Sequence, residues 1–186
     1  WSGTELVFVN GRFSAQLSTV RESSGVEVTS LAAALEQNPG VVRAHLDAHS
    51  DRYQGGFAAL NTAFLQDGAY VHLTGQAAPV YILYVTTERA GSDEPFATTP
   101  RTLIIADAHS EGLVVEHFHG LTDKAYLTNA VTELAIGSGS VVHHCRIHEE
   151  GNAGNHVATM HVAEDRDCRF TSHNFSLSGR LVRNDI

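Results

Sequence analysis

Residues 126–163 read YLTNAVTELAIGSGSVVHHCRIHEEGNAGNHVATMHVA, in which three strand-like runs alternate with glycine-containing turns. The runs are rich in Val, Ile, Thr and other residue types that suit a pleated, half-buried surface. They cover residues 126–136, 140–148 and 156–163. The glycines between them supply the permissive backbone that turns need. This stretch therefore predicts β-strands joined by turns.

The same pattern extends outward over the second half of the chain. Six further strand-like runs cover residues 69–73, 80–87, 102–108, 113–118, 168–178 and 181–186. Turn sequences such as Gly91-Ser-Asp93 and Ser110-Glu-Gly112 lie between them. We therefore predict that residues 69–186 form an all-β unit.

The spacing of these strands indicates a solenoid. Alternate strand centres after residue 100 are about 23–29 residues apart, the length of one coil in a β-solenoid. Ala158, Met160 and Val162 share one face of their strand, as a coil with a narrow interior requires. A sandwich or an antiparallel barrel would show the same alternation. From the residues alone, the parallel β-helix, the sandwich and the barrel all stay open.

The first 68 residues are organised differently and predict a small α/β region, residues 1–68. Leu6 to Phe13 alternates around Asn-Gly, a strong hairpin signal. Thr29 or Ser30 caps a predicted helix that Pro39-Gly40 ends, and a second helical stretch covers residues 41–49. A third amphipathic helix is predicted over residues 55–65.

Composition excludes several classes of function. The formal net charge is -9 and no Lys/Arg cluster is present, which disfavours binding to nucleic acid or anionic membranes. The apolar runs are far shorter than the ~20 residues of a membrane-spanning helix. Two cysteines are too few for a disulfide framework, so a reducing compartment is expected. The strand-like end and the absence of an initiating Met predict a piece of a longer protein.

A series of phrases, in order, resembles the SufB/SufD family of iron-sulfur cluster assembly proteins, with SufD the more similar branch. The phrases include Phe57-Ala-Ala-Leu-Asn-Thr-Ala-Phe64, Asp67-Gly-Ala-Tyr-Val-His72, Pro79-Val-Tyr-Ile-Leu-Tyr-Val85, Val115-Glu-His-Phe118 and Thr128-Asn-Ala-Val-Thr-Glu133. Each phrase alone is weak, but together they cover nearly the whole chain in the family's order.

This resemblance implies a mainly β fold: a right-handed parallel β-helix, or single-stranded solenoid, over residues 69–186, incomplete at its C-terminus. It also implies a scaffold that works with SufB-like and SufC-like proteins, SufC being an ATPase, in the cytoplasm or, in a plant, the plastid stroma. An uncapped last coil further predicts self-association as a homodimer. In SufD a Cys-Ser-His-Gly-type segment carries a His that faces a SufB Cys, and no residue here matches it.

Metal ligation by this chain's own residues is a separate hypothesis. Cys145 and His143 lie at i and i+2 on one strand face, a half-site for a soft metal. Cys168 is about one coil further on, and stacking would place it beside Cys145, with His161 nearby. The alternative is that the cysteines are small buried hydrophobes and the histidines surface polar groups. We expect no cofactor in this chain; iron or an iron-sulfur cluster belongs to the full complex.

The residues fit two other classes of function less well. A cupin-like metal-binding β protein would use His117 and His119 with neighbours from a histidine-rich stretch, namely His144, His148, His156 or His161, but needs antiparallel strands. A β-helix enzyme acting on acidic polysaccharide would need charged side chains clustered on one coil face. The acidic residues here are scattered and are predicted to be solvated charges at the rim: Asp107, Glu116, Glu133 and Asp165. Because no phosphate loop, nucleophile elbow or triad is present, the chain is not predicted to be an enzyme.

Overall fold

The strands of this protein form two sheets that face each other; both are parallel except for the outermost pairs, β1 with β2 and β3 with β4, which are antiparallel. The computed structural model describes residues 3–46, 55–89, 91–92 and 94–186. Sheet A has the order β12-β10-β8-β5-β1-β2: β1 (Thr4–Val9), β2 (Arg12–Phe13), β5 (Val80–Thr86), β8 (Glu111–Gly120), β10 (Val141–Glu149) and β12 (Arg169–Ser178). Sheet B has the order β13-β11-β9-β7-β4-β3: β3 (Val26–Ser30), β4 (Gly68–Leu73), β7 (Arg101–Ala106), β9 (Tyr126–Ile136), β11 (Gly154–Glu164) and β13 (Leu181–Asp185). A short strand, β6 (Phe96–Thr98), also pairs with β9.

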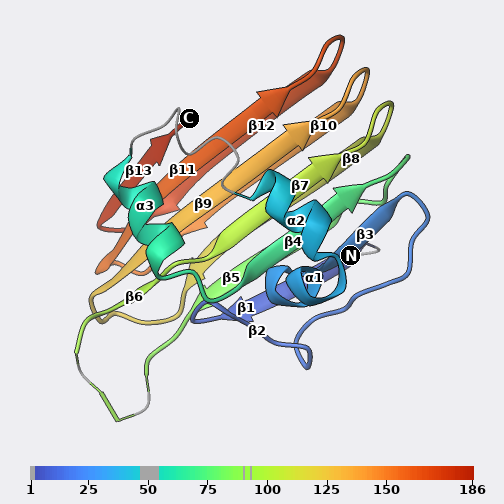
Figure 1. Cartoon of the computed structure of the whole chain (residues 1–186). Helices are drawn as coiled ribbons and strands as arrows, with labels where there is room; N and C mark the ends of the chain where they lie inside the picture. The colour runs from blue at the N-terminus through green and yellow to red at the C-terminus, as the bar shows by residue number, and fades with distance from the viewer. Residues whose placement is uncertain (1–2, 47–54, 90, 93) are drawn as a thin grey trace.

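The chain winds as a solenoid with two strands in each coil, because consecutive long strands alternate between the sheets (Figure 1). All pairings among the strands from β4 to β13 are parallel, and each strand pairs with the strand one coil away. The predicted parallel β-helix is confirmed, and the sandwich and the antiparallel barrel are excluded. The cupin-like alternative is wrong, because a jelly roll needs antiparallel order.

The interior is filled by alternate residues of both sheets. Apolar side chains such as Leu6, Ile82, Ile104 and Leu134 are almost fully buried between the sheets. The parallel register also places similar side chains next to each other on neighbouring strands. The rings of Phe8, Tyr84 and Phe118 form a column on successive strands of sheet A, with ring centroids 5.0 and 4.9 Å apart. His148 continues this column at 5.7 Å from Phe118.

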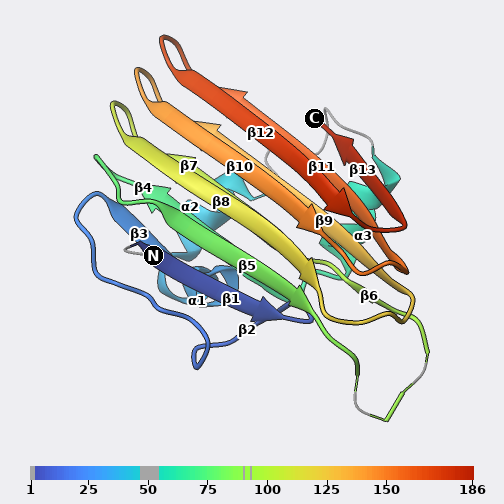
Figure 2. The ribbon, with the colours of Figure 1, turned by 180° about the vertical axis from the view of Figure 1, so that it is seen from behind.

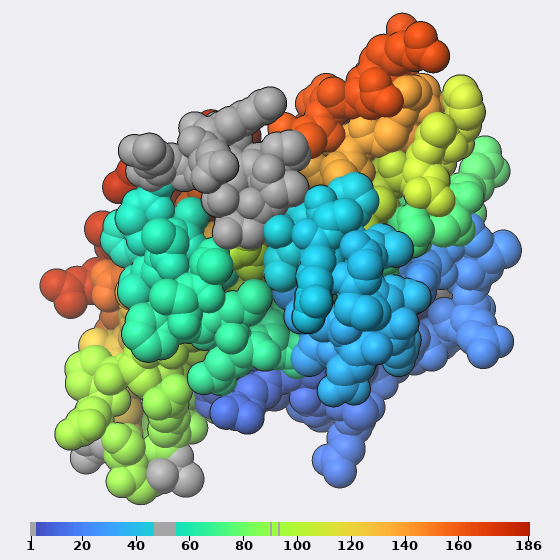
Figure 3. Space-filling view, viewed as in Figure 1, coloured from blue at the N-terminus to red at the C-terminus, as the bar shows by residue number. Residues whose placement is uncertain are grey.

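Three helices cover the outer face of sheet B: α1 (Leu31–Gln37), α2 (Pro39–His45) and α3 (Gly56–Ala63). Leu31, Ala34 and Val42 pack on outward residues of β4 and β7. Figures 1 and 3 show this helical layer, and Figure 2 shows the opposite side, where the described residues place no helix over sheet A. The outer face of sheet A is therefore open to solvent or to a partner.

The helix boundaries explain one difference from the sequence prediction. The Ser30 side chain accepts a hydrogen bond from the Ala33 N–H at 3.2 Å, which confirms the predicted cap. Pro39-Gly40 follows the first helix and also begins the second. Pro is favoured at the first position of a helix because a backbone N–H there would have no hydrogen-bond partner within the helix. Residues 47–49 of the predicted second helix, and Asp93 of a predicted turn, lie outside the described residues.

The predicted N-terminal hairpin is confirmed, since β1 and β2 pair antiparallel around Asn10 and Gly11, both at positive φ. However, β1 also pairs in parallel with β5, so the opening segment supplies a strand to the solenoid. A separate unit over residues 1–68 stays a prediction. Among the described residues, no helix is long and apolar enough to cross a membrane.

Candidate functional site

A buried ionic network occupies the solenoid interior between β8 and β10. Glu116 and Arg146 face each other in register on these strands, and both side chains are essentially inaccessible to solvent. The Arg146 guanidinium donates to Glu116 Oε2 from Nε at 3.2 Å and from one terminal nitrogen at 2.9 Å. His144 Nε2 donates to the same oxygen at 2.8 Å. The alternation that fills the core with apolar residues thus also aligns these charges inside it.

Hydroxyl groups complete the shell around this carboxylate. Thr102 donates to Glu116 Oε1 at 2.5 Å, and Thr132 lies 3.0 and 2.9 Å from the two oxygens. Burial acts to raise the pKa of Glu116, but Arg146 and His144 outweigh it and hold the pKa well below its usual range. Glu116 is therefore an ionised acceptor, unsuited to carry protons near neutral pH.

A second buried group lies beside the first, at the end of the aromatic column. Glu150 accepts hydrogen bonds from His156 Nδ1 and from the Tyr126 hydroxyl, each at 2.6 Å. The rings of His148 and His156 are 4.3 Å apart. Burial, with His156 and Arg146 adding to it, lowers the pKa of His148 to about 3. His148 is therefore neutral at physiological pH, and its ring serves as a polar member of the core.

The rim-charge prediction is wrong for two of its four residues. Glu116 lies in the interior, and Glu133 is buried on the outer side of sheet B, where Arg101 Nε donates to it at 2.9 Å. Asp107 and Asp165 are exposed as predicted. Because glutamate is charged, sequence analysis places it on the solvent side of an alternating strand. In this structure an arginine on the next strand of the same sheet, one coil away, compensates the charge of each of these two buried glutamates.

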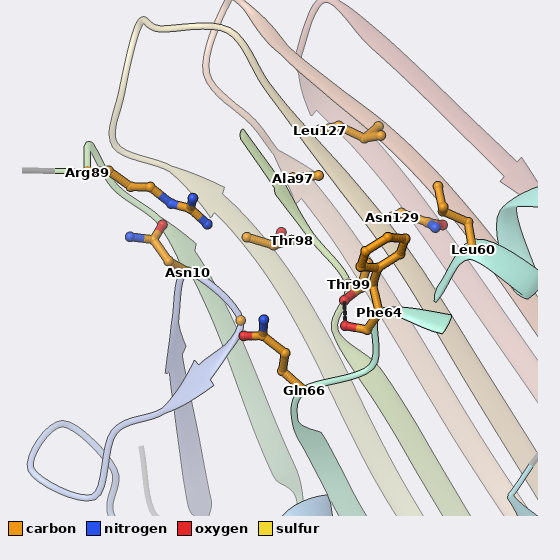
Figure 4. A pocket seen from close by; sticks show the side chains of 11 residues that line it. Asn10, Leu60, Phe64, Gln66, Arg89, Ala97, Thr98, Thr99, Leu127 and Asn129 are labelled. Carbon is orange, nitrogen blue, oxygen red and sulfur yellow. Dashed lines mark hydrogen bonds between the residues drawn. The ribbon is translucent and has the colours of Figure 1, made fainter. Parts of the chain in front are cut away.

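A pocket of ≈ 210 Å³ lies where the β1–β2 turn, the end of α3 and β6 meet (Figure 4). Arg89 and Asn10 lie on one side and Leu60 and Phe64 on another; the Thr99 hydroxyl donates to the Phe64 carbonyl at 2.7 Å. Arg89 also lies over the Phe96 ring, 4.4 Å from its centroid. The lining combines apolar contact with one cation and amide groups, so it suits binding rather than acid–base chemistry.

The structure does not bring the four predicted metal ligands together. His143 and Cys145 share the outer face of β10, whereas His161 lies on the outer face of sheet B. Cys168 precedes β12, and the residue opposite Cys145 on that strand is His173. Cys168 Sγ instead donates to Glu164 at 3.6 Å.

The thiols are also held in their protonated form. Burial raises the pKa of Cys145, and burial together with Glu164 raises the pKa of Cys168. Thiolates, not thiols, are metal ligands. Metal binding by these cysteines stays a prediction, and the geometry offers them no shared ion.

The histidines of the cupin-like alternative are divided among three places. His144, His148 and His156 point into the solenoid, and His161 lies on the outer face of sheet B. His117 and His119 lie on the outer face of sheet A beside Glu149, a potential ligand that the sequence analysis did not identify. Only the coil length could have indicated this carboxylate, because it follows the histidines by one whole coil.

Two regions of the chain match regions of one known protein family. Residues 86–186 match the SufBD core domain of the SUF system for FeS cluster assembly, and residues 2–79 match the SufBD protein N-terminal region. The chain belongs to the SufBD family. The resemblance seen in the sequence is confirmed.

Individual SufBD relatives are distant but cover the chain well. A SufBD family protein of Synechocystis, slr0076, is 24% identical over 98% of this chain and 42% of its own length. Iron-sulfur cluster assembly protein SufD of Escherichia coli is 27% identical over 97% of this chain and 40% of its own length. A chloroplastic SufBD family protein of Arabidopsis thaliana is 29% identical over 72% of this chain and 25% of its own length. The chain thus spans less than half the length of these relatives.

Proposed function

We propose that this chain is part of a SufD-like scaffold of the SUF machinery, working in a SufBCD-type complex with SufB-like and SufC-like proteins. The observation that carries the proposal is the match of both SufBD regions, in order, to a chain that forms a parallel β-helix. The alignment with SufD over 97% of the chain supports the assignment to that branch.

We propose a non-enzymatic role within that machinery. The buried carboxylate with the most strongly lowered pKa, Glu116, is bound by four side chains that stabilise its charge. A general acid or base works best with a pKa near the operating pH and with access to a substrate. Glu116 meets neither condition, and the same contacts make it a structural link between coils.

The open faces of the solenoid are consistent with a scaffold. The outer face of sheet A, over which the described residues place no helix, presents half-exposed apolar residues, and β12 adds the exposed Phe175 and Leu177. Surfaces of this kind suit a protein partner or a second copy of the chain. We place the assembly in the cytoplasm or, in a plant, in the plastid stroma, as the chloroplastic relative suggests.

Co-purification tests this function. The full-length protein that contains this chain is co-expressed with the SufB-like and SufC-like proteins of the same genome, and the complex is resolved by size-exclusion chromatography. The expected result is one peak that contains all three proteins. A folded full-length protein that elutes apart from both partners at every concentration would contradict the proposal.

Two glycine variants control for folding. A Cβ at Gly68 would overlap the Arg101 carbonyl oxygen, so Gly68→Val disrupts the pairing of β4 with β7. A Cβ at Gly40 meets nothing within 4 Å, so Gly40→Val makes the same chemical change without a clash. The complex should survive Gly40→Val and be lost with Gly68→Val, if it depends on the folded solenoid.

A further inference from the structure

Three potential metal ligands from neighbouring coils converge on the open outer face of sheet A. His117 Nε2 lies 3.1 Å from Glu149 Oε2, and His119 Nδ1 lies 2.9 Å from the same oxygen. All three ligand atoms lie within 4.8 Å of one another. The two histidines share one face of β8, and the parallel register places Glu149 of β10 directly beside His119.

The two separations from Glu149 resemble those of ligands around a metal ion. Imidazole nitrogens and carboxylate oxygens bind Zn²⁺ at about 2.0–2.2 Å, which places neighbouring ligand atoms about 3.0–3.4 Å apart in octahedral or tetrahedral geometry. The two distances to Glu149, 3.1 and 2.9 Å, are close to this range. Two histidines with one carboxylate leave coordination positions open, a combination that divalent Fe and catalytic Zn²⁺ centres use.

A hydroxyl on the far side of His117 orients its ring. The Tyr81 hydroxyl lies 2.5 Å from His117 Nδ1. Because an ionised Glu149 can only accept, Nε2 of the metal-free ring carries the proton and Tyr81 donates to Nδ1. When a metal takes Nε2, the imidazole proton moves to Nδ1 and the Tyr81 oxygen accepts it. A hydrogen bond of this kind to the second ring nitrogen is the usual support of a metal-binding histidine.

Solvent access also favours a cation here. The side chains of His119 and Glu149 are 32% and 44% exposed, so water can reach the open positions.

We propose that His117, His119 and Glu149 bind one divalent transition-metal ion on the outer face of sheet A, with Tyr81 as the positioning residue. This site goes beyond the proposed scaffold role and does not rest on it, because its ligands all come from this chain. It is also distinct from the cysteine positions considered above.

Anaerobic titration with Co²⁺ tests the site, because its visible absorption reports ligand number and type. The full-length protein is purified without a histidine tag. One equivalent of Co²⁺ should give a d–d spectrum without the near-ultraviolet band of a thiolate ligand, and Zn²⁺ should displace it. Tyr81→Phe should weaken Co²⁺ binding about 10–100-fold, the usual effect of removing such support. His117→Gln and Glu149→Gln should each remove the one-equivalent spectrum.

Matched controls separate this site from other ligands. His143→Gln changes an exposed histidine on β10 of the same sheet and should leave Co²⁺ binding unchanged. Glu149→Gln keeps the test informative if His117→Gln fails to fold, since Glu149 is the more exposed. One-equivalent binding that survives both ligand variants would overturn the proposal. So would a thiolate band that disappears with Cys145→Ser, or the absence of any one-equivalent binding by the folded wild-type protein.

Discussion

Removing Arg146 should destabilise the solenoid far more than removing an exposed arginine. Arg146→Met deletes both guanidinium hydrogen bonds to Glu116 and leaves a buried carboxylate without its cation. Breaking a buried ion pair from one side costs about 3–5 kcal/mol. Urea unfolding followed by circular dichroism measures this: with a slope of about 2 kcal/mol/M, the midpoint should fall by about 1.5–2.5 M.

The comparison variant is Arg183→Met. Arg183 also pairs with a carboxylate, Asp185, at 3.0 Å, but the two side chains are 59% and 42% exposed. Exposed pairs contribute about 0–1 kcal/mol, so the midpoint should hardly move. The two variants make the same chemical change in buried and exposed settings, so their difference measures the effect of burial.

A double-mutant cycle tests the physical reason. If the cost of Arg146→Met comes from a stranded charge, it should shrink when Glu116→Gln removes that charge, with a coupling of about 2–3 kcal/mol between the two changes. Equal midpoints for Arg146→Met and Arg183→Met would refute the reasoning. Strict additivity in the cycle would refute it as well.

Three further predictions concern pH, the helix cap and iron. The pKa of His148 is about 3 in the folded protein and about 6.5 in the unfolded chain, so the unfolded chain binds the extra proton and the free energy of unfolding falls as pH drops below about 6.5. His148→Phe should therefore reduce the fall in urea midpoint between pH 7 and pH 5. An equal fall in the wild-type protein and the variant would contradict this prediction. Ser30→Ala should cost about 1 kcal/mol in the same assay, whereas exposed Ser24→Ala should cost little. Anaerobic reconstitution with iron and sulfide should leave no stoichiometric cluster on the chain; a chromophore lost in both Cys145→Ser and Cys168→Ser would contradict this.

Sequence periodicity predicted the strands well because burial is decided locally. The run at residues 126–136 is a strand with those bounds, and the other predicted long strands differ by a few residues at their ends. The short strands β3 and β6 were missed, since pieces of five and three residues carry little alternation. Pro39 was interpreted as a stop, although the same ring opens a helix when it stands at the first position.

The functional residues were harder to predict because they depend on register between coils. Strand composition indicates that Cys145 and Cys168 lie about one coil apart, but turn geometry decides which residues meet, and it pairs Cys145 with His173. The same uncertainty hid the partner of Glu116, which is Arg146 one coil later. The i and i+2 relation of His117 and His119 needed no register and was recognised; their carboxylate was not.

The buried ion pair also affects how the solenoid comes apart. In a stacked array each coil contacts only its neighbours, so unfolding can proceed by peeling one coil from the next. The inward residues that β5 places against β8 are apolar, namely Val80, Ile82 and Tyr84, so separation of these strands leaves no charge without its ion-pair partner. Separation of β8 from β10 would remove Arg146 from Glu116. The amides of these two strands should therefore exchange with solvent together, as one cooperative unit, instead of in sequence. The charge pair thus couples the unfolding of two neighbouring coils, which could unfold one after the other if only apolar residues lay between them.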